Sequence, residues 1–350
     1  MKQLDKVGQN ILKKTDMKIG LIGAGRIGQL HAELLTYHIP EVEIKTVADL
    51  YINELKDWAK QLNILNLSTD YTDILNDAEI EAVMICSPTD SHAQLIIEAA
   101  KAGKHIFCEK PIDFNVEKIK QALNSVKAAG VKLQIGFNRR FDHNHKKIHE
   151  IVKSGKVGAV HIVKITSRDP APPSIDYLKT SGGIFLDMMI HDFDMARYVS
   201  MSEVEEVYTQ GAVLIDPAIG QIGDVDTAIV TLKFENGALG VIDNSRQAVY
   251  GYDQRVEVFG SKGYATVEND VPSSAKLSTS EGVTSDKPLY FFLERYKMSF
   301  IDELRSFADA IIKDKEPPVT GFDGLQPVLI GIAALKSLKE KRPVSIKEIV

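Results

Sequence analysis

The feature that most constrains the fold is a glycine-rich segment, Gly23-Ala-Gly25-Arg-Ile-Gly28, between a short apolar run and a longer amphipathic one. The run 19–22 predicts a buried strand, and residues 29–37 have the spacing of a helix. In this strand–turn–helix context, glycines let a dinucleotide pyrophosphate approach a helix N-terminus closely. The alternative is a glycine turn that binds no ligand, and the element that follows favours the nucleotide site.

That element is a second predicted strand, 42–47, which leads into Asp49. A carboxylate about 20 residues beyond the glycine segment can accept hydrogen bonds from the ribose hydroxyls of NAD, and it would repel the 2′-phosphate of NADP. Asp49 could instead cap a helix that begins at residue 52. Arg26, inside the glycine segment, could contact a phosphate and alter this choice. We expect NAD to be preferred.

Strands and helices then alternate up to about residue 137. Strands are predicted at 65–68, 81–86, 104–107 and 131–136, and helices at 71–75, 91–102 and 116–129. Thr89 or Asp90 could cap the second of these helices. Such alternation is typical of an α/β fold with a doubly wound parallel sheet. We therefore predict a Rossmann domain over 17–137, preceded at 1–16 by an N-terminal extension that is either loose or a surface helix.

The second half, 138–350, predicts an α+β domain with a mostly antiparallel open sheet. It is rich in strands from residue 204, and Asn236-Gly237 is a strong hairpin signal. Helices are expected at 141–154, 184–198, 300–312 and 324–339, and a loop or edge region at 272–287. Because one sheet face would stay uncovered, we expect a homo-oligomer, in the form of a homotetramer.

Composition excludes several partner classes. The formal charge of −6 and the pI near 5.9 argue against nucleic acid and anionic membranes. No apolar run approaches the roughly 20 residues of a membrane span. With no signal-peptide pattern, we expect a cytoplasmic protein whose two cysteines, Cys86 and Cys108, are reduced core thiols.

Two short segments carry residues suited to proton and hydroxyl chemistry. Lys110 follows a predicted strand, where open α/β sheets bind ligands, and Pro111 disfavours a helical conformation for it. Glu109 can hold the ammonium or order the loop, and the alternative is a surface turn with a solvated ion pair. Asp187 and His191 lie four apart on one predicted helix. They suit proton handling, metal binding, or a structural capping and core role.

A histidine cluster on the helix 141–154 is the other possible metal ligand set. It comprises His143, His145 and His149. Because histidines are common on exposed helix faces, we expect these side chains to be exposed and no metal to bind.

Together these motifs resemble the Gfo/Idh/MocA oxidoreductases, and most of all their inositol 2-dehydrogenase branch. The resemblance extends from Met17 to the C-terminus. The segments that carry it are Gly23-Ala-Gly-Arg-Ile-Gly28, Cys108-Glu-Lys-Pro111, Gly136-Phe-Asn-Arg-Arg-Phe-Asp142 and Ser181-Gly-Gly-Ile-Phe-Leu-Asp-Met-Met-Ile-His-Asp-Phe-Asp194. It implies that NAD takes a hydride from a secondary carbinol of a small polyol, giving a ketone such as an inosose.

The resemblance also implies residue roles. Lys110 would bind the reacting hydroxyl, His191 would be the general base, and Asp187 would orient it. The implied cofactor-binding residues are Gly23, Gly25, Arg26, Ile27, Gly28, Asp49, Ser87, Thr89, His92, Glu109 and Lys110. The implied substrate-binding residues are Asn138, Arg139, Ser167, Asp169, Asp187, His191 and a tyrosine of the segment 250–252, assigned to Tyr250.

One segment departs from the family pattern. Ser167-Arg-Asp-Pro170 stands where several myo-inositol enzymes are expected to carry a His-Arg-Asn-Pro-like run. A shorter serine and a charged aspartate change which hydroxyl is bound, so myo-inositol is favoured only slightly over scyllo-inositol. Two alternatives remain: a sugar oxidoreductase of the same family, and a non-catalytic nucleotide-sensing regulator on the same fold.

Overall fold

A computed structural model describes residues 17–350, and the expected extension at 1–16 lies outside the described residues. The chain forms two compact units. Among the described residues, unit 1 contains those up to Gly136 and also Phe300–Gly324, and unit 2 contains Phe137–Ser299 and Leu325–Val350. Residues 300–324 thus return to unit 1, whereas the sequence predicts that all residues from 138 to 350 form the second domain.

Unit 1 contains a six-stranded parallel sheet, as the alternating pattern predicts. Its order is β3-β2-β1-β4-β5-β6. The strands are β1 (Met17–Ile22), β2 (Val42–Ala48), β3 (Asn66–Ser68), β4 (Ala82–Ile85), β5 (His105–Glu109) and β6 (Leu133–Gly136). The helices are α1 (Arg26–His38), η1 (Ile52–Leu55), α2 (Lys56–Gln61), α3 (Thr72–Asn76), α4 (Thr89–Lys101) and α5 (Val116–Ala129).

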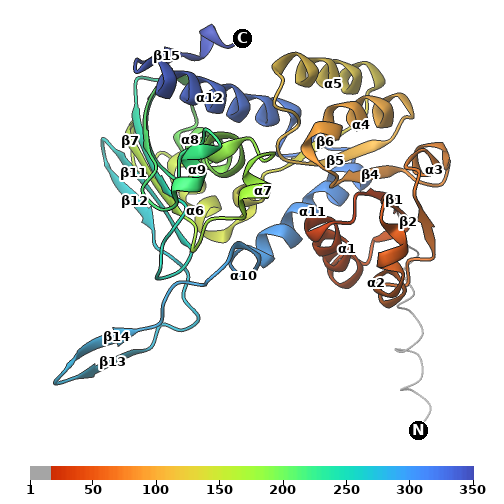
Figure 1. Cartoon of the computed structure of the whole chain (residues 1–350), viewed down its shortest axis with the longest axis horizontal. Coiled ribbons are helices and arrows are strands. Elements are labelled where there is room, and N and C mark those ends of the chain that lie inside the picture. The colour runs from red at the N-terminus through yellow and green to blue at the C-terminus, as the bar shows by residue number, and fades with distance from the viewer. Residues whose placement is uncertain (1–16) are drawn as a thin grey trace. The chain divides into compact units, whose positions relative to one another are not determined.

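Helices cover both faces of this sheet, and its central strand β4 is accordingly apolar and buried along its whole length. Helices α4 and α5 pack against each other on one face (Figure 1). On the other face, α11 (Lys297–Ile312) packs beside α1. There Phe107 of β5 meets Phe307 edge-to-face with ring centroids 5.8 Å apart, and His31 of α1 meets Phe300 at 5.7 Å. The late segment 300–312 therefore completes the core of unit 1.

Unit 2 contains a seven-stranded sheet of order β12-β11-β7-β10-β9-β8-β15. Only β7 and β10 pair in parallel, so the expected mostly antiparallel sheet is confirmed. The strands are β7 (Val160–Arg168), β8 (Val204–Ala212), β9 (Thr227–Phe234), β10 (Leu239–Ser245), β11 (Asp253–Gly260), β12 (Gly263–Val267) and β15 (Val344–Ser345). The last of these is too short to be predicted from its pattern.

The helices of unit 2 are mostly short, apart from α6, α8 and α12. They are η2 (Asn138–Phe141), α6 (His143–Lys153), α7 (Ile175–Leu178), the π-helical turn η3 (Ile184–Met188), α8 (Ile190–Ser200), α9 (Pro217–Gln221), α10 (Phe292–Arg295), α12 (Gly321–Glu340, whose first turn belongs to unit 1) and η4 (Ile346–Glu348). Helix α8 is buried along nearly its whole length and packs on α6 and β7. The single helix expected over 184–198 is therefore divided into a π-helical turn and α8.

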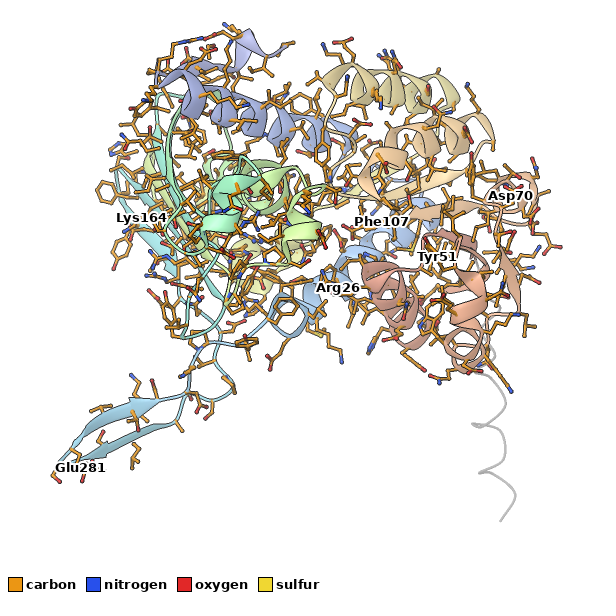
Figure 2. All side chains as sticks on the ribbon, viewed as in Figure 1. Arg26, Tyr51, Asp70, Phe107, Lys164 and Glu281 are labelled. Carbon is orange, nitrogen blue, oxygen red and sulfur yellow. The ribbon has the colours of Figure 1, made fainter. Side chains whose placement is uncertain are left out.

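The region 272–287, expected to be a loop or edge, contains a separate hairpin. Strands β13 (Lys276–Thr279) and β14 (Gly282–Ser285) pair only with each other, and all their residues are exposed. Figures 1 and 2 show this hairpin extending from the unit 2 sheet with Glu281 at its tip. An isolated two-stranded hairpin has little stability of its own.

Candidate functional site

The glycine segment of unit 1 has the geometry of a phosphate cradle. Gly23 has a φ of 88°, and a Cβ on Gly28 would lie 2.1 Å from the Gly23 carbonyl oxygen. A Cβ on Gly25 would meet nothing within 4 Å, so the helix N-terminus is open there. No acidic residue stands in the first turn of α1, where Arg26 and Ile27 lie (Figure 2 labels Arg26). An uncompensated helix N-terminus of this kind suits an anion.

Asp49 is fixed beside this cradle by two backbone N–H groups. Ala24 N–H donates to Oδ2 at 2.7 Å, and Tyr51 N–H donates to Oδ1 at 2.8 Å. The short helix η1 has Tyr51, not Asp49, as its N-cap residue, so the alternative in which Asp49 caps this helix is wrong. The carboxylate is therefore oriented at the end of β2, where a ribose hydroxyl of a dinucleotide would be bound.

The turn after β4 is joined to the turn after β5 by a buried histidine. His92 Nε2 lies 2.7 Å from the Ser87 carbonyl oxygen, and Nδ1 lies 2.8 Å from that of Pro111. The Ser87 and Ser91 hydroxyls are 2.6 Å apart. Thr89 is the first residue of α4, and the N-cap residue is Pro88, which makes no side-chain hydrogen bond to the helix. Neither Thr89 nor Asp90 therefore caps this helix. His92 thus holds two ligand-facing turns in one arrangement.

Glu109 orders the strand end that precedes Lys110. Its Oε1 lies 2.6 Å from His31 Nε2, and its Oε2 accepts from the Lys110 backbone N–H at 3.3 Å. The Lys110–Pro111 peptide bond is cis. Glu303 of α11 is fully buried, and neither of its carboxylate oxygens has a hydrogen-bond partner. Burial, together with the charge of Glu109, raises the pKa of Glu303 well above its usual value.

In unit 2, Arg139 organises a buried polar cluster. Its Nη1 donates to Asp192 Oδ1 at 2.6 Å, and its Nη2 donates to the Tyr252 hydroxyl at 3.1 Å. Asn244 Nδ2 donates to the other Asp192 oxygen at 2.9 Å. Burial raises the pKa of Asp192 even though Arg139 opposes the shift. The neighbouring Asn138 is also buried.

Strand register brings two further predicted residues to this cluster. Ser167 of β7 pairs with Asn244 of β10 and with Gln254 of β11, and all three side chains are buried. They form a polar row across the inner face of the sheet. Asp169 follows β7, and desolvation raises its pKa to about 6, against the opposing effects of Arg246 and Arg139. Asp169 is therefore partly protonated near neutral pH.

Asp187 and His191 lie on different elements, η3 and α8. Asp187 Oδ1 accepts from the Tyr177 hydroxyl at 2.9 Å, and its Oδ2 lies 3.8 Å from Arg246 Nη1. The His191 ring packs edge-to-face on Phe137 at 5.9 Å between centroids. The sequence did not single out Tyr177 or Arg246.

The two tyrosines of the segment 250–252 differ in environment. Tyr250 is substantially exposed, donates to Asp253 Oδ2 at 2.6 Å and accepts from Arg168 Nη1 at 3.4 Å. Tyr252 is buried, with its hydroxyl on Arg139. The structure therefore brings Tyr252, and not Tyr250, together with the predicted substrate-binding residues.

The expectation of exposed histidines on α6 is partly wrong. His143 is exposed, His149 is partly buried, and His145 is buried with a pKa lowered to about 4 by desolvation. His143 lies near the carboxylates of Asp142 and Asp270. Arg295 Nη1 binds both of these carboxylates, at 2.5 and 3.0 Å, so an arginine supplies the positive charge at this position.

Comparison with known families decides the assignment. Residues 17–137 match the model of an oxidoreductase family described as an NAD-binding Rossmann fold, and residues 145–266 match the GFO/IDH/MocA C-terminal domain. The chain belongs to the Gfo/Idh/MocA oxidoreductase family. Its Rossmann unit is that of an NAD-binding family, in agreement with the open glycine cradle and the oriented Asp49.

Similar members of the Gfo/Idh/MocA family match nearly the whole chain. An uncharacterized oxidoreductase of Bacillus subtilis, YrbE, is 55% identical over 94% of this chain and 96% of its own. The myo-inositol 2-dehydrogenase of Thermotoga maritima is 48% identical over 95% of this chain and 100% of its own. The structure of the scyllo-inositol dehydrogenase of Lactobacillus casei with NAD(H) and scyllo-inositol superimposes with a TM-score of 0.89, at 30% identity, covering 95% of this chain and 100% of that one.

No helix among residues 17–350 is long and apolar enough to span a membrane. The two cysteines are both free, as expected, but only Cys108 is fully buried, whereas Cys86 is half-buried.

Proposed function

We propose that the protein is an NAD-dependent inositol 2-dehydrogenase that oxidises a ring hydroxyl of myo-inositol to an inosose. The observation that carries the proposal is the full-length similarity to the Thermotoga maritima myo-inositol 2-dehydrogenase. The choice of the myo isomer rests on that one similarity, because several other relatives named for myo-inositol, at 23 to 28% identity, are no more similar to this chain than the scyllo-inositol dehydrogenases at 30 and 34%.

The residues of unit 1 fit NAD. The open position over Gly25 accommodates the pyrophosphate, and Asp49 presents a carboxylate held by two N–H groups to the ribose. Because both carboxylate oxygens already accept backbone hydrogen bonds, the charge cannot easily turn away from a 2′-phosphate. NAD is therefore preferred over NADP.

When bound, NAD would accept the hydride that leaves the carbinol carbon of the substrate. Lys110 donates a hydrogen bond to the reacting hydroxyl, and His191 accepts its proton. Asp187 is held by Tyr177 and orients His191. Because a nucleotide sensor has no need of a base, the presence of all three side chains favours an enzyme.

The polar cluster of unit 2 suits a ring with many hydroxyls. Its buried atoms without a hydrogen-bond partner include an acceptor, Asn244 Oδ1, and a donor, Gln254 Nε2, and Asp169 adds a carboxylate. A ring hydroxyl can both donate and accept, so it can pair with either kind of atom. Such a site rejects analogues that lack a hydroxyl, because its buried polar groups are then left unpaired. Inositols should therefore exceed simple secondary alcohols by orders of magnitude in kcat/KM.

The test is NADH formation with myo-inositol, scyllo-inositol and glucose measured side by side. The proposal expects myo-inositol to have the highest kcat/KM. If glucose is oxidised faster than both inositols, the protein is a sugar oxidoreductase of this family. Tight NAD binding without turnover of any polyol or sugar would identify a nucleotide sensor.

We further propose that the protein is a cytoplasmic homotetramer. On the outer face of the unit 2 sheet, four exposed apolar side chains lie in one register row, and they are Tyr264, Phe259, Ile162 and Leu239. An exposed apolar row across four strands is typical of an interface, and a second copy of this sheet is the natural partner.

Light scattering of the wild type and of Ile162→Glu tests this assembly. We expect a tetramer for the wild type and smaller species for the variant, because the variant places a charge at the centre of the row. Lys164→Glu, on the same face but outside the row, is the control. A wild type that is monomeric at micromolar concentration would refute the assembly.

A further inference from the structure

Arg246 is a buried arginine with unused hydrogen-bond donors. Its side chain is only 1% exposed, yet Nε and Nη2 have no hydrogen-bond partner. Its nearest carboxylates are Asp187 and Asp224, each 3.8 Å away and therefore beyond hydrogen-bond distance. Leaving donors of a charged group buried and unpaired is costly, so a partner is expected in the working protein.

The two unused donors belong to one edge of the guanidinium group. Nε–H and one Nη2–H point the same way in the plane and form a fork that binds two acceptor atoms side by side. A single acceptor would leave one of them unused. The geometry therefore calls for a ligand with two neighbouring oxygens.

Strand register places this fork beside the candidate substrate residues. Arg168 of β7 pairs with Ser245 of β10 in the parallel direction, so Asp169 and Arg246 occupy the next step on neighbouring strands. Asp169 N–H donates to the Ser245 carbonyl at 3.0 Å, and Ala248 N–H donates to the Asp169 carbonyl at 2.7 Å. Because side chains alternate along a strand, Asp169 and Arg246 follow Ser167 and Asn244 on the inner face.

Local charge determines which kind of ligand fits. The carboxylates in this part of unit 2 are Asp169, Asp187, Asp192 and Asp224, and the guanidinium groups are Arg139 and Arg246. Because carboxylates are in excess, a ligand carboxylate or phosphate would be repelled. Two adjacent hydroxyls fit better, since their oxygens accept from the fork while their protons can be donated to neighbouring carboxylates such as Asp169.

We propose that the Nε/Nη2 edge of Arg246 binds two adjacent ring hydroxyls of the polyol substrate. Arg246 is then a specificity-determining residue next to the proposed catalytic residues Asp187 and His191. The assignment rests on the proposed function, because it presupposes an inositol substrate.

The test couples a change in the protein to a change in the substrate. Kinetics are measured for the wild type, Arg246→Lys and Arg246→Gln, with myo-inositol and its monodeoxy analogues. Lysine keeps the charge but has no fork. Arg168→Lys is the matched control, because it lies one residue from Asp169, faces the other side of the sheet and binds Asp243. Melting temperatures show whether each variant folds.

We expect Arg246→Lys to lower kcat/KM for myo-inositol by about 10- to 100-fold, mainly through KM, as for a lost charge-assisted hydrogen bond. For the monodeoxy analogue that lacks a bound hydroxyl, the loss should be several-fold smaller. The wild type itself should discriminate against at least two adjacent monodeoxy analogues. Arg168→Lys should behave as the wild type.

Two results would overturn the assignment. One is a wild type that shows no discrimination against any pair of adjacent monodeoxy analogues, which is decisive even if the Arg246 variants do not fold. The other is a folded Arg246→Lys that loses the same factor on every substrate, which would make Arg246 a structural counter-charge for Asp187 and Asp224. A wild type inactive on all inositols would instead refute the proposed function, and this assignment with it.

Discussion

Replacing Glu303 with glutamine should stabilise the protein increasingly as the pH rises. Glu303 is fully buried on α11, neither of its carboxylate oxygens is hydrogen-bonded, and the charge of Glu109 disfavours its ionisation. Its pKa in the folded protein is therefore raised well above 4.5. A glutamine has nearly the same shape and cannot ionise.

The magnitude follows from proton linkage. Above pH 4.5 an unfolded chain releases the Glu303 proton, while the folded protein keeps it. The contribution of Glu303 to the free energy of unfolding is therefore fully present below pH 4.5. It is lost as the pH rises toward the pKa that Glu303 has in the folded protein. One proton of difference corresponds to about 1.4 kcal/mol per pH unit in the free energy of unfolding. Over two pH units, the free energy of unfolding of Glu303→Gln should therefore rise by up to about 2.7 kcal/mol relative to that of the wild type.

Urea unfolding of the wild type and Glu303→Gln at a series of pH values between about 5 and 8 measures this difference. Glu316→Gln is the control, because it makes the same substitution at an exposed position. A stability difference between Glu303→Gln and wild type that does not change with pH would show that Glu303 is ionised in the folded protein, and the reasoning would fail.

Three further predictions concern activity. The wild type should prefer NAD over NADP by at least about tenfold, and Asp49→Ser should narrow that ratio; equal use of NADP by the wild type would contradict the role of Asp49. Lys110→Met should bind NAD in a fluorescence titration but lose most turnover. Full activity of this variant would show that Glu109-Lys110-Pro111 is an ordinary surface turn without a catalytic role. Since the carboxylate of Asp169 ionises at about pH 6 and accepts better when charged, kcat/KM should fall as the pH drops through that value. The Asp169→Asn variant should lack this decrease in kcat/KM near pH 6. If its pH profile is the same as that of the wild type, Asp169 is not the group responsible.

Local patterns predict the parallel sheet of unit 1 well because its strands and the helices between them follow one another in sequence. The glycine segment, the position of Asp49 and the strand before Lys110 each depend on a few neighbouring residues. The same reasoning cannot place Glu303 beside Glu109, because it gives no sign that residues 300–324 return to the first unit. A buried glutamate inside an amphipathic helix has the pattern of an ordinary exposed one.

In unit 2, the missed residues depend on strand pairing. Arg246 follows β10, a strand that the hairpin signal Asn236-Gly237 indicates, but its nearness to Asp169 requires the parallel pairing of β7 with β10. No local signal specifies that pairing. Tyr252 and Tyr250 are likewise equivalent in sequence, and only the burial of one of them separates the two.

The divided course of unit 1 has a consequence for how the protein is made. The strands of its sheet leave the ribosome first, but Phe300 and Phe307, which cover His31 and Phe107, follow only after nearly all of unit 2 has been synthesised. Until then one apolar face of the nascent sheet lacks its cover, and such a surface binds chaperones or aggregates. The N-terminal unit therefore cannot mature as the chain emerges, and its completion is one of the last events of biosynthesis.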